Sequence, residues 1–228
     1  MNTRDALRRL IESNTAVIFD FDNVIVDSEP YHFEAYSRVF AKAGHTLDRA
    51  EYWLEWTSRG GGAESEIRRY NLGLDPAALR AEKDPIYSAF CSSGAIKPFA
   101  EAIAVIEAFE KAGLVLAIAS GSYERDIRAI LSANGIEHRF GVIVGKDHVK
   151  RTKPYPETYL VAAERLGLPP ERCLAIEDAE KGVTSAKEAG MSVILIETEI
   201  TKDLELGGAD LMLSSLAELR DLLKDLTV

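Results

Sequence analysis

With 228 residues, 46% of them hydrophobic, the chain is long enough to bury a sizeable core, so we expect one or two globular domains rather than a disordered protein. Its formal net charge of −10, without a long basic run, argues against nucleic acid as a partner. Cys91 and Cys173 do not stand at a metal-ligand spacing and are expected to be reduced thiols.

The start of the chain predicts a helix rather than a targeting segment. No stretch approaches the ~20 apolar residues of a membrane span, and the charged first 14 residues lack the apolar segment of a signal peptide. Their apolar positions fit one face of a helix. We therefore expect a cytoplasmic protein without a membrane partner, whose first helix docks on the rest of the chain.

The first predicted strand, Ala16–Phe19, is apolar and contains β-branched residues, as buried strands usually do. Asp20 and Asp22 follow it, and because side chains alternate along a strand, the two carboxylates should point the same way. Two acids so close repel each other, and a buried charge is costly unless it is paired. The pair therefore needs a divalent cation, a shared proton or an arginine partner, or else it is only an acidic turn.

A helical region without strand patterns follows, from Pro30 to about Ile96. Helical spacing predicts a first helix ending at Gly44, while Asp48 should cap a second helix and Asp75 a third. Two tryptophans of the second helix are expected in the core of this region, and a flexible glycine-rich loop should precede the third helix. These features are Trp53, Trp56 and Ser58–Gly62.

Strands and helices alternate after Lys97, which predicts a parallel sheet covered by helices on both faces. The predicted fold class is α/β, a Rossmann-like sheet with an additional small all-helical cap domain. We expect a core domain of residues 1–29 and 97–228 and a cap domain of residues 30–96, joined by two hinges. The predicted strands are Leu114–Ala119, Val142–Val144, Cys173–Ile176 and Val193–Ile196, and the predicted helices are Phe99–Ala112, Ser122–Ala133, Glu157–Leu166 and Gly182–Ala189.

Polar residues suited to phosphate chemistry follow these strands, and open parallel sheets bind ligands beyond the carboxyl ends of their strands. Ser120, Gly121 and Ser122 offer hydroxyls and amides ahead of a helix, which can bind an anion, although Ser122 could instead be a helix cap. Lys153, between prolines that fix the backbone, could neutralise a phosphate, whereas most lysines are simply solvated.

Glu177 and Asp178 follow the fourth strand in the series. Mg²⁺ prefers oxygen ligands and is usually held by one or two carboxylates together with phosphate and water. Asp178 could therefore close a magnesium site from across the sheet. As an isolated acidic pair it would be unremarkable, and its place in the series of strand ends gives it weight.

Taken together, these residues resemble the haloacid dehalogenase superfamily of phosphotransferases, over nearly the whole chain from Thr15 onward. The resemblance rests on the first motif, Asp20-Phe21-Asp22-Asn23-Val24 followed by Asp27-Ser28-Glu29-Pro30, and on Lys153-Pro154 and Glu177-Asp178. The helical insertion directly after the first motif is similar to that of the branch containing phosphoglycolate phosphatase, small sugar-phosphate phosphatases and β-phosphoglucomutase.

The resemblance implies a role for each matching residue. Asp20 matches the nucleophile and Asp22 the general acid/base, while Ser120 matches the phosphate-binding hydroxyl and Lys153 the charge-neutralising lysine. The implied Mg²⁺ ligands are Asp20, the backbone carbonyl of Asp22, Asp178 and Glu177.

Two positions depart from the family pattern. Asn23 stands where glycine is usual, and because asparagine tolerates the left-handed backbone region best after glycine, we expect the turn to survive. Ala179 stands where serine is common, which implies the loss of one hydrogen bond to the metal ligands.

The sequence thus predicts a Mg²⁺-dependent phosphatase that hydrolyses a small phosphomonoester, a sugar phosphate or phosphoglycolate-like metabolite, through a phospho-aspartate. A β-phosphoglucomutase-type phosphomutase is the main alternative, because His32 and Arg59 could bind a sugar phosphate from the cap side. A dehalogenase or phosphonate hydrolase would not need Asp22, and a phosphorylation-switched receiver would not place a second acid beside its nucleophile. Neither the substrate's identity nor the oligomeric state is predicted.

Overall fold

Two units make up the chain: Met1–Asp27 with Lys97–Val228, and Ser28–Ile96. The computed structural model describes residues 2–58, 61–198 and 208–224. None of the helices described there has the length and apolar character needed to cross a membrane.

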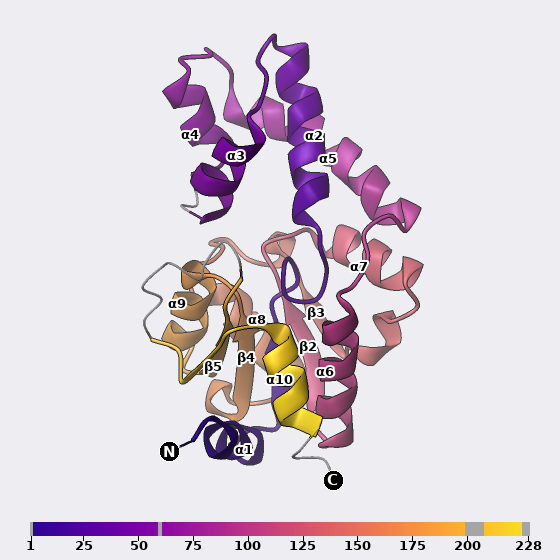
Figure 1. Cartoon of the computed structure of the whole chain (residues 1–228), viewed down its shortest axis with the longest axis vertical. Coiled ribbons are helices and arrows are strands. Elements are labelled where there is room, and N and C mark those ends of the chain that lie inside the picture. The colour runs from indigo at the N-terminus through magenta and orange to yellow at the C-terminus, as the bar shows by residue number, and fades with distance from the viewer. Residues whose placement is uncertain (1, 59–60, 199–207, 225–228) are drawn as a thin grey trace. The chain divides into compact units, whose positions relative to one another are not determined.

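A six-stranded parallel sheet lies at the centre of the first unit (Figure 1). Its order is β3-β2-β1-β4-β5-β6, so β1 lies between β2 and β4 and the chain runs outward on either side. The carboxyl ends of these three central strands meet at one edge, where open sheets bind ligands. The strands are β1 (Ala16–Phe19), β2 (Val115–Ala119), β3 (Val142–Val144), β4 (Cys173–Glu177), β5 (Ser192–Ile196) and β6 (Leu211–Leu213).

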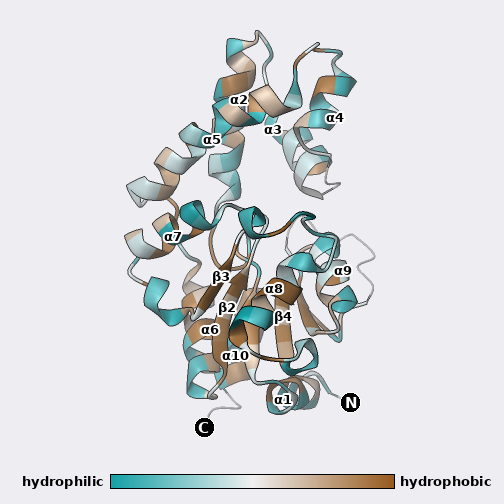
Figure 2. Cartoon of the chain, turned by 180° about the vertical axis from the view of Figure 1, so that it is seen from behind, coloured by the Kyte–Doolittle hydropathy of each residue, from teal (hydrophilic) through white to brown (hydrophobic). Residues whose placement is uncertain are grey.

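Helices cover both faces of the sheet, whose strands are strongly hydrophobic (Figure 2). On one face, Tyr159 and Val183 of two helices pack in a single buried cluster with Ile18. On the other face, Phe19 meets Phe109 edge-on, with ring centroids 6.1 Å apart. The predicted α/β class is therefore confirmed. The helices are α1 (Thr3–Ser13), α6 (Ala100–Lys111), α7 (Glu124–Ala133), α8 (Glu157–Leu166), α9 (Glu180–Glu188) and α10 (Leu216–Lys224).

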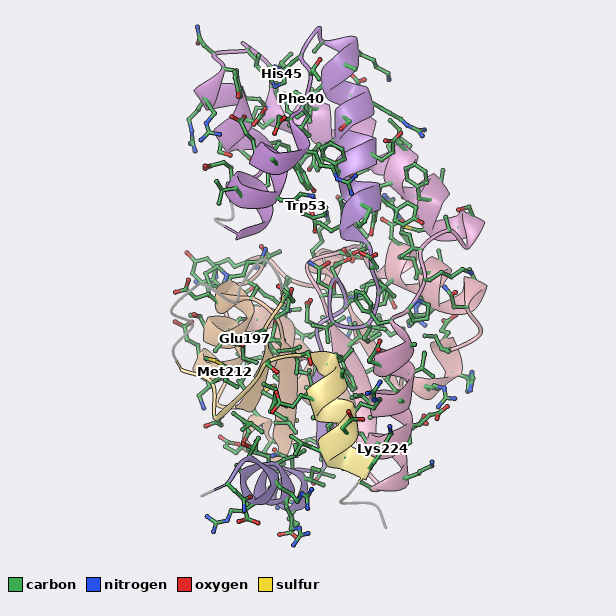
Figure 3. All side chains as sticks on the ribbon, in the orientation of Figure 1. Phe40, His45, Trp53, Glu197, Met212 and Lys224 are labelled. Carbon is green, nitrogen blue, oxygen red and sulfur yellow. The ribbon has the colours of Figure 1, made fainter. Side chains whose placement is uncertain are left out.

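The second unit is helical and has its own aromatic core. Phe40 and Trp56 are buried there and Trp53 packs against them, as predicted for the two tryptophans. Figure 3 labels Phe40, Trp53 and His45, whose ring lies 5.4 Å from that of Phe40. The buried carboxylate of Glu66 pairs with His45 at 2.7 Å. The elements are α2 (Glu29–Lys42), α3 (Arg49–Glu51), a π-helical turn (Tyr52–Ser58), α4 (Gly62–Arg69) and α5 (Pro76–Ser93).

The predicted caps of this unit are confirmed. The Asp48 side chain accepts a hydrogen bond from the backbone N–H of Glu51, and Asp75 accepts from those of Ala77 and Ala78. The loop predicted over Ser58–Gly62 is too long, because the π-helical turn runs to Ser58 and α4 begins at Gly62. Arg59 and Gly60 lie outside the described residues.

Candidate active site

The first motif leaves β1 in a tight turn. Asp20 extends the pairing of β1, because its N–H donates to the carbonyl of Ile176 on β4 at 2.9 Å. Asn23 has φ = 61°, and its N–H donates to the carbonyl of Val26 at 2.9 Å. The left-handed turn expected at Asn23 is therefore present. It places Asp20, which is buried, and Asp22, which is half-buried, at the edge where β1, β2 and β4 end.

Lys153 lies at the same edge with its ammonium group out of solvent. Its side chain is 6% exposed, and Nζ donates to Asp20 Oδ1 at 2.6 Å and to Glu177 Oε1 at 2.5 Å. Although burial opposes the charge, these two carboxylates raise the pKa of the lysine above its ordinary value. Lys153 is therefore a buried cation between two buried acids, and the solvated alternative is wrong.

Three carboxylates gather around this ammonium group. Oxygen atoms of Asp20, Glu177 and Asp178 lie within 4.8 Å of one another. Burial raises the pKa of Asp20 to about 7, against the opposing effect of Lys153, and burial together with Asp20 and Glu177 raises the pKa of Asp178 well above its ordinary value. Buried oxygen ligands in mutual repulsion are the set that a hard divalent cation stabilises. These residues therefore fit a Mg²⁺ ion.

Asp22 has different partners from Asp20. Its Oδ2 accepts a hydrogen bond from Ser122 Oγ at 2.7 Å and a longer one from Ser120 Oγ at 3.4 Å. The Ser120 hydroxyl in turn accepts from the N–H of Ser122 at 3.0 Å. Two hydroxyls after β2 thus orient the second acid of the motif.

The segment after β2 differs from prediction in one respect. Helix α7 begins at Glu124 rather than Ser122, and its preceding residue, Tyr123, makes no side-chain cap. The N–H of Glu124 donates to Asp147 at 2.9 Å, so that amide already binds a carboxylate. Ser122 is therefore not a helix cap. A Cβ atom at Gly121 would meet nothing within 4 Å, so no close approach requires glycine there.

Sequence reasoning missed two residues beside Glu177. Tyr159, on the first turn of α8, donates from its hydroxyl to Glu177 Oε1 at 2.6 Å. Gly182, on α9, lies so close that a Cβ atom would be 2.0 Å from the carboxyl carbon of Glu177. One signal was available for each: a tyrosine six residues after Lys153, and a glycine inside a predicted helix, where it costs about 1 kcal/mol relative to alanine.

The residues predicted to bind substrate from the helical region belong to the second unit. The His32 ring stacks on Tyr87 with centroids 3.8 Å apart, and its Nδ1 accepts a hydrogen bond from Lys83 Nζ at 2.9 Å. Arg59 lies outside the described residues. A substrate-binding role for either remains a prediction.

Comparison with known proteins gives consistent matches. A family model described as haloacid dehalogenase-like hydrolase matches residues 15–190. Fructose-1-phosphate phosphatase YqaB of Escherichia coli is 32% identical over 187 residues, which cover 81% of this chain and 97% of that protein. Two crystal structures of CbbY from Rhodobacter sphaeroides each cover 90% of this chain and 96% of that chain with a TM-score of 0.76. One, in complex with phosphate, is 31% identical, and the other, a mutant with xylulose-(1,5)-bisphosphate, is 30% identical.

Proposed function

The chain belongs to the haloacid dehalogenase-like hydrolase family, and on that premise we propose that it hydrolyses a small phosphomonoester through a phospho-aspartate at Asp20. The family resemblance inferred from the motifs is confirmed by these matches. A cytoplasmic, Mg²⁺-dependent enzyme acting on a phosphorylated sugar is the form of the proposal that the sequence and the relatives favour together.

One observation carries the proposal: the two acids of the first motif have different partners. Asp20 is bound by the ammonium group of Lys153, whereas Asp22 is bound by the hydroxyls of Ser122 and Ser120. A nucleophile needs neighbouring positive charge when it attacks an anion, and a proton carrier needs to be held in place. The contacts therefore support Asp20 as the nucleophile and Asp22 as the general acid/base.

In the proposed reaction, an oxygen of Asp20 attacks phosphorus in line and forms an acyl phosphate, while the bond from phosphorus to the leaving oxygen breaks. Asp22 donates a proton to that leaving alkoxide. It then removes a proton from the water that attacks the acyl phosphate, which restores the Asp20 carboxylate and releases inorganic phosphate.

Charge neutralisation comes from Lys153, which lies 2.6 Å from Asp20 and offsets its repulsion from the phosphate dianion. Asp20 and Asp178 would hold Mg²⁺, which when bound supplies further positive charge to the phosphate oxygens. Ser120 and the neighbouring amide of Gly121 would bind phosphate oxygens from the β2 side.

The substrate class follows from the relatives. The similar proteins include a fructose-1-phosphate phosphatase and a CbbY mutant whose crystal structure contains xylulose-(1,5)-bisphosphate. We therefore expect a phosphorylated sugar as substrate. The phosphomutase alternative shares the same core chemistry and differs only in returning the phosphoryl group to a sugar hydroxyl.

A phosphate-release screen over small phosphomonoesters with Mg²⁺ tests the proposal. It should include fructose 1-phosphate, xylulose 1,5-bisphosphate, phosphoglycolate and β-glucose 1-phosphate, with glucose 6-phosphate formation measured in parallel. Asp20→Asn should abolish turnover, and Asp5→Asn, an exposed acid on α1, is the control that should not. Full activity of Asp20→Asn would contradict the proposal, glucose 6-phosphate without phosphate release would favour the mutase, and a phosphorylated protein stable for many minutes would favour a receiver.

A further inference from the structure

The side chain of Tyr159 lies beside Glu177 and Lys153 in the candidate active site. It is 0% exposed and belongs to the buried cluster between α8 and the sheet. A buried hydroxyl loses its hydration and usually finds a partner, and here it donates to Glu177 Oε1 at 2.6 Å. A phenylalanine would pack equally well, so the hydroxyl serves the carboxylate rather than the core.

Glu177, in turn, is engaged by the protein on both oxygens. Its Oε1 accepts from Lys153 Nζ and from the Tyr159 hydroxyl, and its Oε2 accepts from the N–H of Asp178 at 3.2 Å. The side chain is 1% exposed. These contacts fix the Glu177 carboxylate in one position and direct it toward Lys153.

That position requires a glycine on the neighbouring helix. A Cβ atom at Gly182 would lie 2.0 to 2.1 Å from the carboxyl atoms of Glu177, closer than side-chain atoms can approach. Since the crowded atoms belong to a buried carboxylate bound on both oxygens, they cannot easily move aside. The backbone of α9 and the hydroxyl of Tyr159 therefore enclose the carboxylate from two sides.

These contacts of Glu177 determine the surroundings of the Lys153 ammonium group. Among the described residues, this group donates to Asp20 Oδ1 at 2.6 Å, to Glu177 Oε1 at 2.5 Å and to the Tyr159 hydroxyl at 3.4 Å. The ammonium group also lies 4.8 Å from the centroid of the Tyr159 ring. The flexible four-carbon side chain of Lys153 is thus held by Asp20, the proposed nucleophile, and by Glu177 and Tyr159, which do not react.

We propose that Tyr159 is a positioning residue: its hydroxyl holds Glu177 in the space that Gly182 leaves open, and Glu177 holds the Lys153 ammonium group against Asp20. Glu177 belongs to the carboxylate cluster that fits Mg²⁺, and because the protein binds both of its oxygens, its contribution here is made through Lys153. The inference rests on the proposed function, because it concerns how Lys153 reaches the phosphoryl group.

Tyr159→Phe tests this with the loss of a single oxygen atom. We expect kcat and the affinity for inorganic phosphate each to fall on the order of tenfold or more, as for a hydrogen bond to a charged group, while the Mg²⁺ concentration for half-activation changes little. Phosphate affinity is measured by calorimetry in the presence of Mg²⁺. The matched control is Tyr155→Phe, which removes the hydroxyl of a tyrosine that is 47% exposed in the same segment and should change neither quantity.

The route through Glu177 is tested by a double-mutant cycle. In a Glu177→Ala background, Tyr159→Phe should lose most of its effect, because the hydroxyl then has no carboxylate to position. An undiminished effect there, or kcat and phosphate affinity within about twofold of the parent for Tyr159→Phe alone, would overturn the inference. If Tyr159→Phe fails to fold, Glu177→Gln, which keeps the shape of the side chain and weakens its hold on Lys153, decides by the same two measurements. Failure of the proposed function itself is distinguishable, since the parent would then release no phosphate in the screen, or Asp20→Asn would remain active.

Discussion

Replacing Lys153 by methionine removes the ammonium group that is bound to both Asp20 and Glu177, while keeping a side chain of similar length. The side chain of Lys153 is 6% exposed and those of its two partners are similarly buried, so water cannot replace the lost charge cheaply. Asp20, Glu177 and Asp178 would then face one another within 4.8 Å without that cation. The variant therefore isolates the neutralising role of Lys153.

The expected size of the effect follows from the geometry. Two unit charges about 4 Å apart interact by ~4 kcal/mol at an effective dielectric constant of 20, and breaking a buried ion pair costs about 3–5 kcal/mol. If the transition state loses the same interaction, ~4 kcal/mol at about 1.4 kcal/mol per factor of ten lowers kcat/KM roughly 10³-fold. The metal-free variant should also be less stable by about 3–5 kcal/mol at pH 8.

Phosphate release from the preferred substrate gives kcat/KM, and urea unfolding at pH 8 gives the free energy of unfolding. The control is Lys150→Met, an exposed lysine in the same segment, which should alter neither quantity appreciably. A folded Lys153→Met protein that keeps kcat/KM within tenfold of the parent would refute the charge-neutralisation argument. Unchanged stability at pH 8 would refute the claim that the buried acids depend on this lysine.

Three further predictions concern the same edge of the sheet. Ser122→Ala removes the 2.7 Å hydrogen bond to Asp22, so kcat should fall about five- to tenfold with little change in KM, and an unchanged kcat would argue against that role. Asn23→Gly should leave the urea midpoint nearly unchanged because φ is 61°, whereas Asn23→Val should cost about 1–2 kcal/mol; equal midpoints would contradict a strained turn. Burial raises the pKa of Asp20 to about 7 and that of Asp178 well above its ordinary value, so the folded state holds protons that the unfolded chain releases. Metal-free stability should therefore fall as pH rises from about 4 toward 7, and calorimetry should find Mg²⁺ raising Tm more at pH 8 than at pH 5.

The strand ends were visible in the sequence because two simple rules converge there. An apolar run of four or five residues predicts a buried strand, and parallel strands bring their carboxyl ends together. The polar residues after the first, second and fourth predicted strands were therefore expected near one another. Asp20 and Ser120 do follow β1 and β2, whereas Glu177 is the last residue of β4. β6 and α10 escaped prediction. Unlike β3, which is equally short and was predicted, β6 has no β-branched residue, and its middle residue Met212 is exposed.

The residues that surround Glu177 were not predicted from the sequence, for a different reason. A tyrosine inside a helix has the pattern of a core residue, and Tyr159 is one, so its hydroxyl contact is invisible to periodicity. The role of Gly182 depends on the distance between α9 and the end of β4, which is a tertiary quantity. Sequence patterns give the strand ends, whereas the supports of a side chain depend on how neighbouring elements pack.

The partner of the first acid shows how charge balance links these observations. The sequence required a divalent cation, a shared proton or an arginine for Asp20 and Asp22, and the structure provides a lysine for Asp20 and two hydroxyls for Asp22. Fully ionised, Asp20, Glu177 and Asp178 with Lys153 would carry a formal charge of minus two. A divalent cation would bring this group to neutrality. Without one, protonation is the alternative, because burial raises the pKa of both Asp20 and Asp178. The lysine therefore meets only part of the requirement read from the motif, and the remaining negative charge is what the proposed divalent cation would neutralise.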